Sequence, residues 1–239
     1  MSGAVIRVGC VATIITLSYA CALMVPDRVQ NVIRGQAGWL QFVQLLLLAD
    51  LCFYLAHRLV HTVPWLWRFH AVHHSSEQMD WLATFRVHPV DQVLNSTIIA
   101  VPAVTLGFSP APLLAYAFLY RVHSLLLHSN VHVGFGPLER VFASPRYHHW
   151  HHADEPQAYD RNFGGQLVIW DRFFDTLYES DDLPARYGVA GTVPNGYVQQ
   201  LLTPLLSKRR RRTRKPSCAR RSAVPTLPSP SSASAAASD

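Results

Sequence analysis

Histidines in four tight clusters constrain this chain more than any other feature of its sequence. Ten of its 13 histidines form two patterns, His-x3-His and His-x2-His-His, and each pattern occurs twice. Spacings of three and four residues place side chains on one face of a helix, and the neutral imidazole is the commonest metal ligand. We therefore predict a metal centre built from His57, His61, His70, His73, His74, His128, His132, His148, His151 and His152.

Ten imidazoles exceed what a single ion takes, because zinc usually binds four ligands. Two ions with about five nitrogens each fit the number of histidines. The chain has no Glu-x2-His pattern of the kind that ferritin-like di-iron bundles use. Imidazole suits iron, zinc, copper and nickel alike, so ligand type alone leaves the metal open.

The other three histidines do not share these helix faces. His149 points about 100° away from its clustered neighbours, and we do not count it as a ligand. His123 falls off the face of His128, and we expect a structural role. His88 stands alone before Pro89. It is either an extra ligand or a group that orients one.

The apolar residues are concentrated in long stretches that carry almost no charge. Arg7 is the one charge in residues 4–25, Asp50 the one in residues 39–56, and Arg121 the one basic residue in residues 92–127. A bilayer core needs roughly 20 apolar residues per helix. We predict transmembrane helices near residues 4–25, 39–60, 92–108 and 111–129. The alternative is a soluble all-helical protein with unusually apolar helices.

Arginine placement predicts the orientation of these spans. An even number of spans leaves both termini on one side, and that side carries most arginines, whereas the opposite loops carry only Arg28 and Arg34. Cytoplasmic loops are the ones enriched in arginine and lysine. The predicted fold class is all-α: a four-transmembrane-helix bundle, multi-pass, with both termini and a helical cap on the cytoplasmic side. The cap holds the histidine-rich di-metal centre.

The net charge of +6 comes from the C-terminal tail. Nine basic residues follow Ser207, and the chain before them holds 12 basic and 14 acidic residues, a net charge of −2. Nucleic-acid binding therefore has no support in the body of the protein. We predict a membrane-embedded domain over residues 1–206 and a disordered tail over residues 207–239. The tail either contacts anionic head groups or is a solvated end.

Asp50 lies within the second apolar stretch, on the same helix face as Tyr54, His57 and His61. An acid inside a membrane helix is costly unless it is paired. Asp50 either accepts the second ring N–H of a ligand histidine, as outer partners of metal sites commonly do, or makes a helix-packing hydrogen bond to a tyrosine or arginine. Farther along, residues 160–180 are expected to form a partly amphipathic element at the membrane interface.

Further motifs accompany the histidines in a fixed order: Phe69-His70-Ala71-Val72-His73-His74-Ser75, His128-Ser129-Asn130, Asn162-Phe163-Gly164 and Trp170-Asp171-Arg172-Phe173-Phe174. Over about residues 45–180 the chain resembles the fatty acid hydroxylase / sterol desaturase superfamily of integral membrane enzymes. It departs from that pattern at Asp175, where members often have glycine before the final threonine. That departure concerns the geometry of a turn.

The resemblance implies a non-haem centre of two iron ions, with zinc possible in their place, and O2 as co-substrate. It implies oxidation of an unactivated C–H bond of a lipid drawn from the bilayer, by hydroxylation or desaturation, with a sterol or fatty acyl substrate left open. It also implies an external electron donor of the cytochrome b5 or ferredoxin type with its reductase. Asn130 and Asn162 are the candidate catalytic residues, expected to hold water or polar groups beside the metals. The oligomeric state is open.

Three other functions compete with this one. A zinc-dependent membrane hydrolase or isomerase would act without oxygen or reductant. A bis-histidine haem carrier would need facing histidines inside the spans, and the adjacent histidines at span ends argue against it. A metal storage or transport protein would need polar residues along a pore, of which the sequence shows few.

Overall fold

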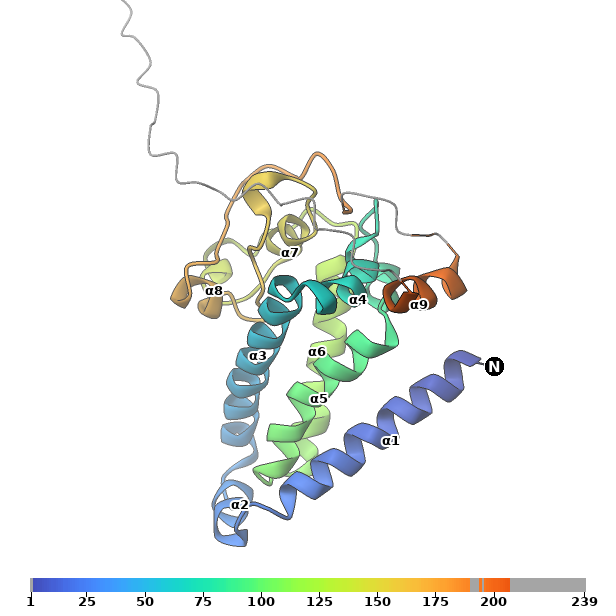
Figure 1. The fold of residues 1–239 in the computed structure, drawn as a ribbon. Coiled ribbons are helices and arrows are strands. Elements are labelled where there is room, and N and C mark those ends of the chain that lie inside the picture. Colours follow the sequence, from blue (N-terminus) through green and yellow to red (C-terminus); the bar gives the residue numbers. More distant parts are fainter. Residues whose placement is uncertain (1, 190–193, 195, 207–239) are drawn as a thin grey trace, which may run out of the picture.

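The computed structural model describes residues 2–189, 194 and 196–206, which are drawn in colour in Figure 1. The predicted disordered tail, residues 207–239, lies outside the described residues. Within them the protein is helical, with no strand beyond two isolated bridges. This confirms the all-α class. The helices are α1 (Ser2–Ala22), α2 (Asp27–Arg34), α3 (Gly38–Thr62), α4 (Pro64–His74), α5 (Pro89–Thr105), α6 (Pro110–His128), α7 (Pro145–His151), α8 (Ile169–Phe173) and α9 (Tyr197–Leu206).

Helices α3, α5 and α6 form the core of the bundle, and α1 runs obliquely along α5 (Figure 1). Both α5 and α6 begin with proline, whose fixed φ suits the first helical turn and whose missing N–H is not needed there. Between them Gly107 takes a φ of +82°, where a side chain would collide with Gln30. The core of the bundle consists of Leu45, Ala49, Ala103, Phe108 and Tyr116.

The structure has helices at all four places where membrane spans were predicted. By length and apolarity, however, only Gly38–Thr62 among the described residues could cross a membrane unaided. The pair Val11–Ala22 and Asp27–Arg34, bent by 111°, could form a second, broken span. Helix α5 has 17 residues, fewer than the roughly 20 that a bilayer core requires. The four-span bundle therefore remains a prediction.

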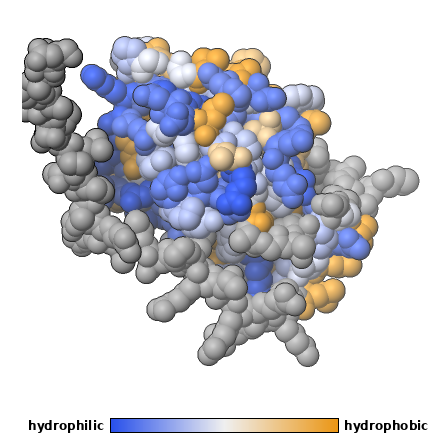
Figure 2. Space-filling model, turned by 90° about the horizontal axis from the view of Figure 1, so that it is seen from above, coloured by the Kyte–Doolittle hydropathy of each residue, from blue (hydrophilic) through white to orange (hydrophobic). Residues whose placement is uncertain are grey.

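A cap of shorter helices and loops covers one end of the bundle (Figure 1). The chain turns at Val63, whose extended backbone ends α3 and lets α4 cross the bundle end. Figure 2 looks down on this cap and shows mostly hydrophilic side chains with scattered apolar ones. Residues 160–180 are not one amphipathic element as predicted. Only Ile169–Phe173 is helical there, and the rest folds back onto the cap.

Candidate metal centre

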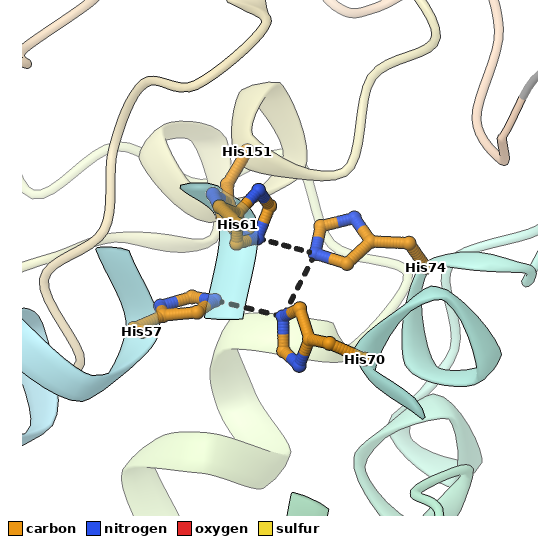
Figure 3. Close-up of side chains that lie close together, drawn as sticks. All are labelled: His57, His61, His70, His74 and His151. Atoms are coloured by element: carbon orange, nitrogen blue, oxygen red, sulfur yellow. Dashed lines mark hydrogen bonds between the residues drawn. The ribbon is translucent and has the colours of Figure 1, made fainter. Parts of the chain in front are cut away.

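Nine histidines converge where the cap meets the bundle, in two adjoining groups. Each group could hold a metal ion, because its nitrogen atoms all lie within 4.8 Å of one another. The five-histidine group, drawn in Figure 3, consists of His57, His61, His70, His74 and His151. The four-histidine group consists of His73, His128, His148 and His152. The rings of His74 and His152 stack 4.4 Å apart, so the two groups share a border.

The spacing of the nitrogens fits shared metal ions. In the five-histidine group, the Nε2 atoms of His57 and His70 lie 3.1 Å apart, and those of His61 and His74 lie 3.1 Å apart. In the other group, Nε2 of His148 lies 3.0 Å from Nε2 of His128. Two imidazoles at about 2.1 Å from one ion have nitrogens roughly 3.0–3.4 Å apart, depending on the bond angle. The donor set and its geometry therefore suit two ions.

The ligands come from both halves of the chain because helical spacing aims each pattern at the centre. Helix α3 supplies His57 and His61 from its last two turns. Helix α4 supplies three histidines, one of which, His73, points to the other group. Helix α7 and its C-cap likewise divide their histidines, with His151 in the five-histidine group and His148 and His152 in the other.

Outer hydrogen bonds fix three rings of the five-histidine group. Nδ1 of His57 lies 2.9 Å from the carbonyl oxygen of Phe163, and Nδ1 of His151 lies 2.9 Å from that of Arg161. Nδ1 of His70 lies 2.9 Å from a carboxylate oxygen of Asp91. Each acceptor draws the ring proton to Nδ1, which leaves Nε2 free to bind a metal.

Among the described residues, the four-histidine group has fewer such contacts, one of them between His73 and the backbone of Arg86. Nδ1 of His128 lies 2.8 Å from the carbonyl oxygen of Ser124 in its own helix. In the described part of the chain, Nδ1 of His148 and Nδ1 of His152 have no hydrogen-bond partner.

Burial keeps the cap histidines neutral. It lowers the pKa of His73, His74, His148, His151 and His152 well below the ordinary value, and the neighbouring histidines lower each pKa further. A neutral imidazole is the form that binds metals. The cluster is thus prepared to bind cations without first releasing protons.

The structure does not bring His132 to either group. Helix α6 ends at His128, and Ser129 has extended backbone angles (φ −65°, ψ 151°). The helix face predicted for His-x3-His therefore does not exist. His132 is exposed, and its ring lies 6.0 Å from that of His149.

The two candidate catalytic asparagines do not reach the histidine groups through any contact in the described structure. Asn130 is exposed. Asn162 is fully buried, and its amide is used up by the backbone: it donates to the carbonyls of Tyr147 and Tyr178 and accepts from the N–H of Tyr178. Its role here is to hold the loop whose next residue, Phe163, orients His57.

The remaining histidines are held by structural contacts. His149 lies against the carbonyl of Ser129 and the hydroxyl of Tyr187. His123 contacts the carbonyl of Ala143. His88 caps α5 by accepting from the N–H of Val90, and its other nitrogen lies 3.1 Å from the carbonyl of Leu201 in α9. None of the three belongs to either histidine group. This agrees with the prediction for His149 and His123, and it answers the question that the sequence left open for His88.

Asp50 follows neither of the two roles foreseen for it. Its carboxylate accepts hydrogen bonds from the backbone N–H groups of Gln166 and Leu167, at 2.7 and 3.0 Å. It therefore anchors the loop beyond Phe163 to α3. Asp171 holds the same loop, since it accepts from the N–H groups of Phe163 and Gly164. Burial raises the pKa of Asp171.

The functional residue that sequence reasoning missed is Asp91. It is buried in the first turn of α5, beside His70, and it also accepts from the side-chain amide of Asn95. Its position in the sequence could have identified it, because an acid at the edge of an apolar stretch needs a partner just as Asp50 does.

A cavity of about 350 Å³ lies between α3, α5 and α6 and opens onto the two histidine groups. Five histidines line its upper end: His57, His70, His73, His128 and His148. Its lower end is lined by side chains of the bundle core, among them Leu45, Ala103 and Tyr116. Ligand pockets typically begin at roughly 300 Å³, so the cavity is large enough for part of an apolar chain.

Comparison with known proteins gives this arrangement a family. The model of the fatty acid hydroxylase family matches residues 42–176, which include every histidine of both groups. The chain belongs to the fatty acid hydroxylase family. The resemblance seen in the motifs is thereby confirmed.

Its relatives are lipid hydroxylases and monooxygenases. The chain is 36% identical to the ornithine lipid hydroxylase OlsE of Rhizobium tropici, over 72% of this chain and 52% of that protein. It is 30% identical to the alkylglycerol monooxygenase of Caenorhabditis elegans and 31% identical to that of Homo sapiens, in each case over 59% of this chain. These matches cover 28% and 31% of the two relatives. The chain thus spans about half the length of the Rhizobium protein and less than a third of these two monooxygenases. No solved structure matches the chain significantly.

Proposed function

We propose that this protein is a membrane-bound, O2-dependent lipid hydroxylase with two iron ions. The observation that carries the proposal is the meeting of two histidine groups with the upper end of a largely apolar cavity. The names of the more similar relatives, an ornithine lipid hydroxylase and alkylglycerol monooxygenases, favour hydroxylation over desaturation and an ornithine lipid or an alkylglycerol over a sterol.

The five-histidine and four-histidine groups would hold one ion each. When bound, the ions supply the redox chemistry that activates oxygen toward an aliphatic C–H bond, which side chains cannot supply. The reaction inserts one atom of O2 into a C–H bond, and the other atom leaves as water after uptake of two electrons and two protons. An external electron donor of the cytochrome b5 or ferredoxin type, with its reductase, provides the electrons.

The chain's own residues position and shield this reaction. Phe163, Arg161 and Asp91 orient three imidazoles so that Nε2 faces the centre. The walls of α3, α5 and α6 hold the lipid against the histidines, and the cap covers the centre from the aqueous side. Exclusion of water prevents reducing equivalents from being lost in side reactions.

In the bilayer, we propose that α1, α3, α5 and α6 all cross the membrane, with the cap and both termini in the cytoplasm. The short α5 and the bent α1–α2 pair would span with help from their neighbours. Single cysteines placed in the α1–α2 turn and in the cap, labelled with a membrane-impermeant reagent on intact cells, test this. The reagent should label the cysteine in the turn and not the one in the cap. The opposite result would show that the cap faces the outside of the cell.

Two measurements on the purified full chain separate this function from its rivals. Metal analysis of anaerobically purified protein should give two iron ions per chain. Product formation from a lipid should require both O2 and a reductant. Activity that persists without O2 would instead identify a zinc hydrolase or isomerase.

A further inference from the structure

Arg121 is the one residue among Asp, Glu, Lys and Arg in helix α6, and it lines the cavity. It is exposed, and its guanidinium carbon lies 5.6 Å from the centre of the Phe85 ring. No carboxylate of the described residues forms an ion pair with it. A guanidinium without a carboxylate partner can donate paired hydrogen bonds to an anion that comes from outside the chain. An anionic group of a bound molecule could form this ion pair with the guanidinium of Arg121.

The cavity that Arg121 lines is divided by polarity. Toward the histidines, α5 contributes Gln92, Asn95 and Ser96, and α6 contributes Arg121 and Ser124. Away from the histidines the walls are apolar, with Ile99, Ala100, Ala103, Leu113 and Ala117. An amphiphile therefore fits in one orientation, with its head group in the half that adjoins the metal centre and its chain in the apolar half.

The position of Arg121 along α6 points the same way. It precedes His128 by seven residues, or about 10 Å along the helix axis. The short helix η1 (Trp81–Phe85) packs beside it and exposes Trp81 and Phe85. Exposed tryptophan and aromatic rings mark the head-group level of a membrane. The histidines then lie beyond that level, so the lipid atoms nearest them belong to its head end.

We propose that Arg121 binds the acidic group of the substrate lipid, a carboxylate or a phosphate, and that the oxidised C–H bond lies in the head group or in the first few carbons of the chain. This deepens the proposed hydroxylase function and rests on it. The planar guanidinium suits both anions, because it can donate two parallel hydrogen bonds to either. The oxidation keeps the balance given above: the C–H bond, O2, two electrons from the external donor and two protons yield the alcohol and water.

Binding is tested apart from activity, on the full chain in neutral detergent. The probes are ornithine lipid for the carboxylate, phosphatidylglycerol for the phosphate and a monoalkylglycerol as the neutral lipid. The Arg121→Gln variant should lose about tenfold in affinity for the acidic lipid that binds best and keep its affinity for the alkylglycerol. Arg121→Lys should lose less. Arg140→Gln, which removes an exposed charge outside the cavity, should match the wild type. Equal losses for acidic and neutral lipids would overturn the assignment.

The site of oxidation is tested by mass spectrometry of the products with a plugged cavity. Ala117→Phe fills the apolar half, and it should weaken the use of long chains while the new hydroxyl stays at the head end. A hydroxyl at mid-chain, or one that moves with the plug, would overturn the proposal. If acidic lipids bind preferentially but no lipid is oxidised, the hydroxylase function fails while Arg121 keeps its role. If the wild type and Arg121→Gln oxidise lipids with the same KM, the hydroxylase function stands and the role proposed for Arg121 fails.

Discussion

The five-histidine and four-histidine groups are made of the same side chain but differ in what surrounds them. Three rings of the five-histidine group are held by acceptors outside it, from a loop and from Asp91. In the four-histidine group, His128 is held by a carbonyl of its own helix and His73 by the backbone of Arg86, and two rings have no partner at Nδ1 within the described residues. Outer partners fix ring orientation and raise ligand basicity. We infer that the five-histidine group is the stiffer site and would bind an ion more tightly than the four-histidine group.

The cavity touches the two groups unequally. Three of the five histidines that line it belong to the four-histidine group. Catalytic metal sites keep an open position, whereas structural sites fill every position with protein ligands. The smaller, less restrained group, which faces the cavity, is therefore the one suited to change its contacts during the reaction. The larger group is suited to keep its ion in place.

The largest effect should follow the loss of ligands from the four-histidine group. The His148→Ala/His152→Ala variant should retain one metal ion per chain and form no detectable product, because the remaining pair cannot hold an ion. Metal content by mass spectrometry and product assays measure this. His132→Ala, which removes an exposed histidine outside both groups, is the control and should keep two ions. Wild-type turnover by the double variant would end the two-group interpretation.

A second effect should fall on the five-histidine group alone. Asp91→Asn removes the negative charge beside His70 and should weaken metal binding at that group by roughly 10- to 100-fold, the usual cost of losing such a partner. Chelator competition measures the two affinities separately. Asp80→Asn, at the cap of η1, provides the control. An equal loss at both groups would show that Asp91 serves the fold rather than one site.

Much of this site could be predicted because periodicity carries the information. Histidines three and four residues apart lie on common faces wherever the helix continues through them, and nine of the ten predicted ligands lie together. His132 was the exception because the helix ends at His128. The sequence Ser129-Asn130 is a plausible end for a helix, but the spacing alone did not reveal it.

Other parts of the site could not be predicted from residue types. The acceptors for His57 and His151 are backbone carbonyls of Phe163 and Arg161, which any residue could supply. Their position depends on the loop contacts that Asp50 and Asn162 make. Helical periodicity could place Asp50 on the histidine face of α3, but it could not show that its partners are the N–H groups of a loop more than a hundred residues away.

The anchoring of this loop yields the third prediction. Asp50→Asn leaves one of the two buried backbone N–H groups without an acceptor, which should lower the free energy of unfolding by about 1–3 kcal/mol. The five-histidine group should also lose its ion at a lower temperature than the four-histidine group does. Thermal unfolding in detergent with metal-release assays measures both. The exposed Asp27→Asn is the control. Unchanged unfolding would mean that the loop is held by Asp171 and its own contacts alone.

The smallest effect should come from the position where the chain departs from its family's pattern. Asp175 has a φ of +56°, the left-handed conformation that glycine adopts without strain, so the turn is kept although the glycine is not. Asp175→Gly should therefore raise the free energy of unfolding by less than about 1 kcal/mol and leave both metal affinities unchanged.

Asn162 also has a positive φ, of 58°, yet its amide makes three backbone hydrogen bonds. Asn162→Gly should be destabilising and should loosen the five-histidine group. The two glycine variants should therefore change the free energy of unfolding in opposite directions. A change in the same direction would contradict the interpretation that strain dominates at Asp175 and side-chain hydrogen bonds at Asn162.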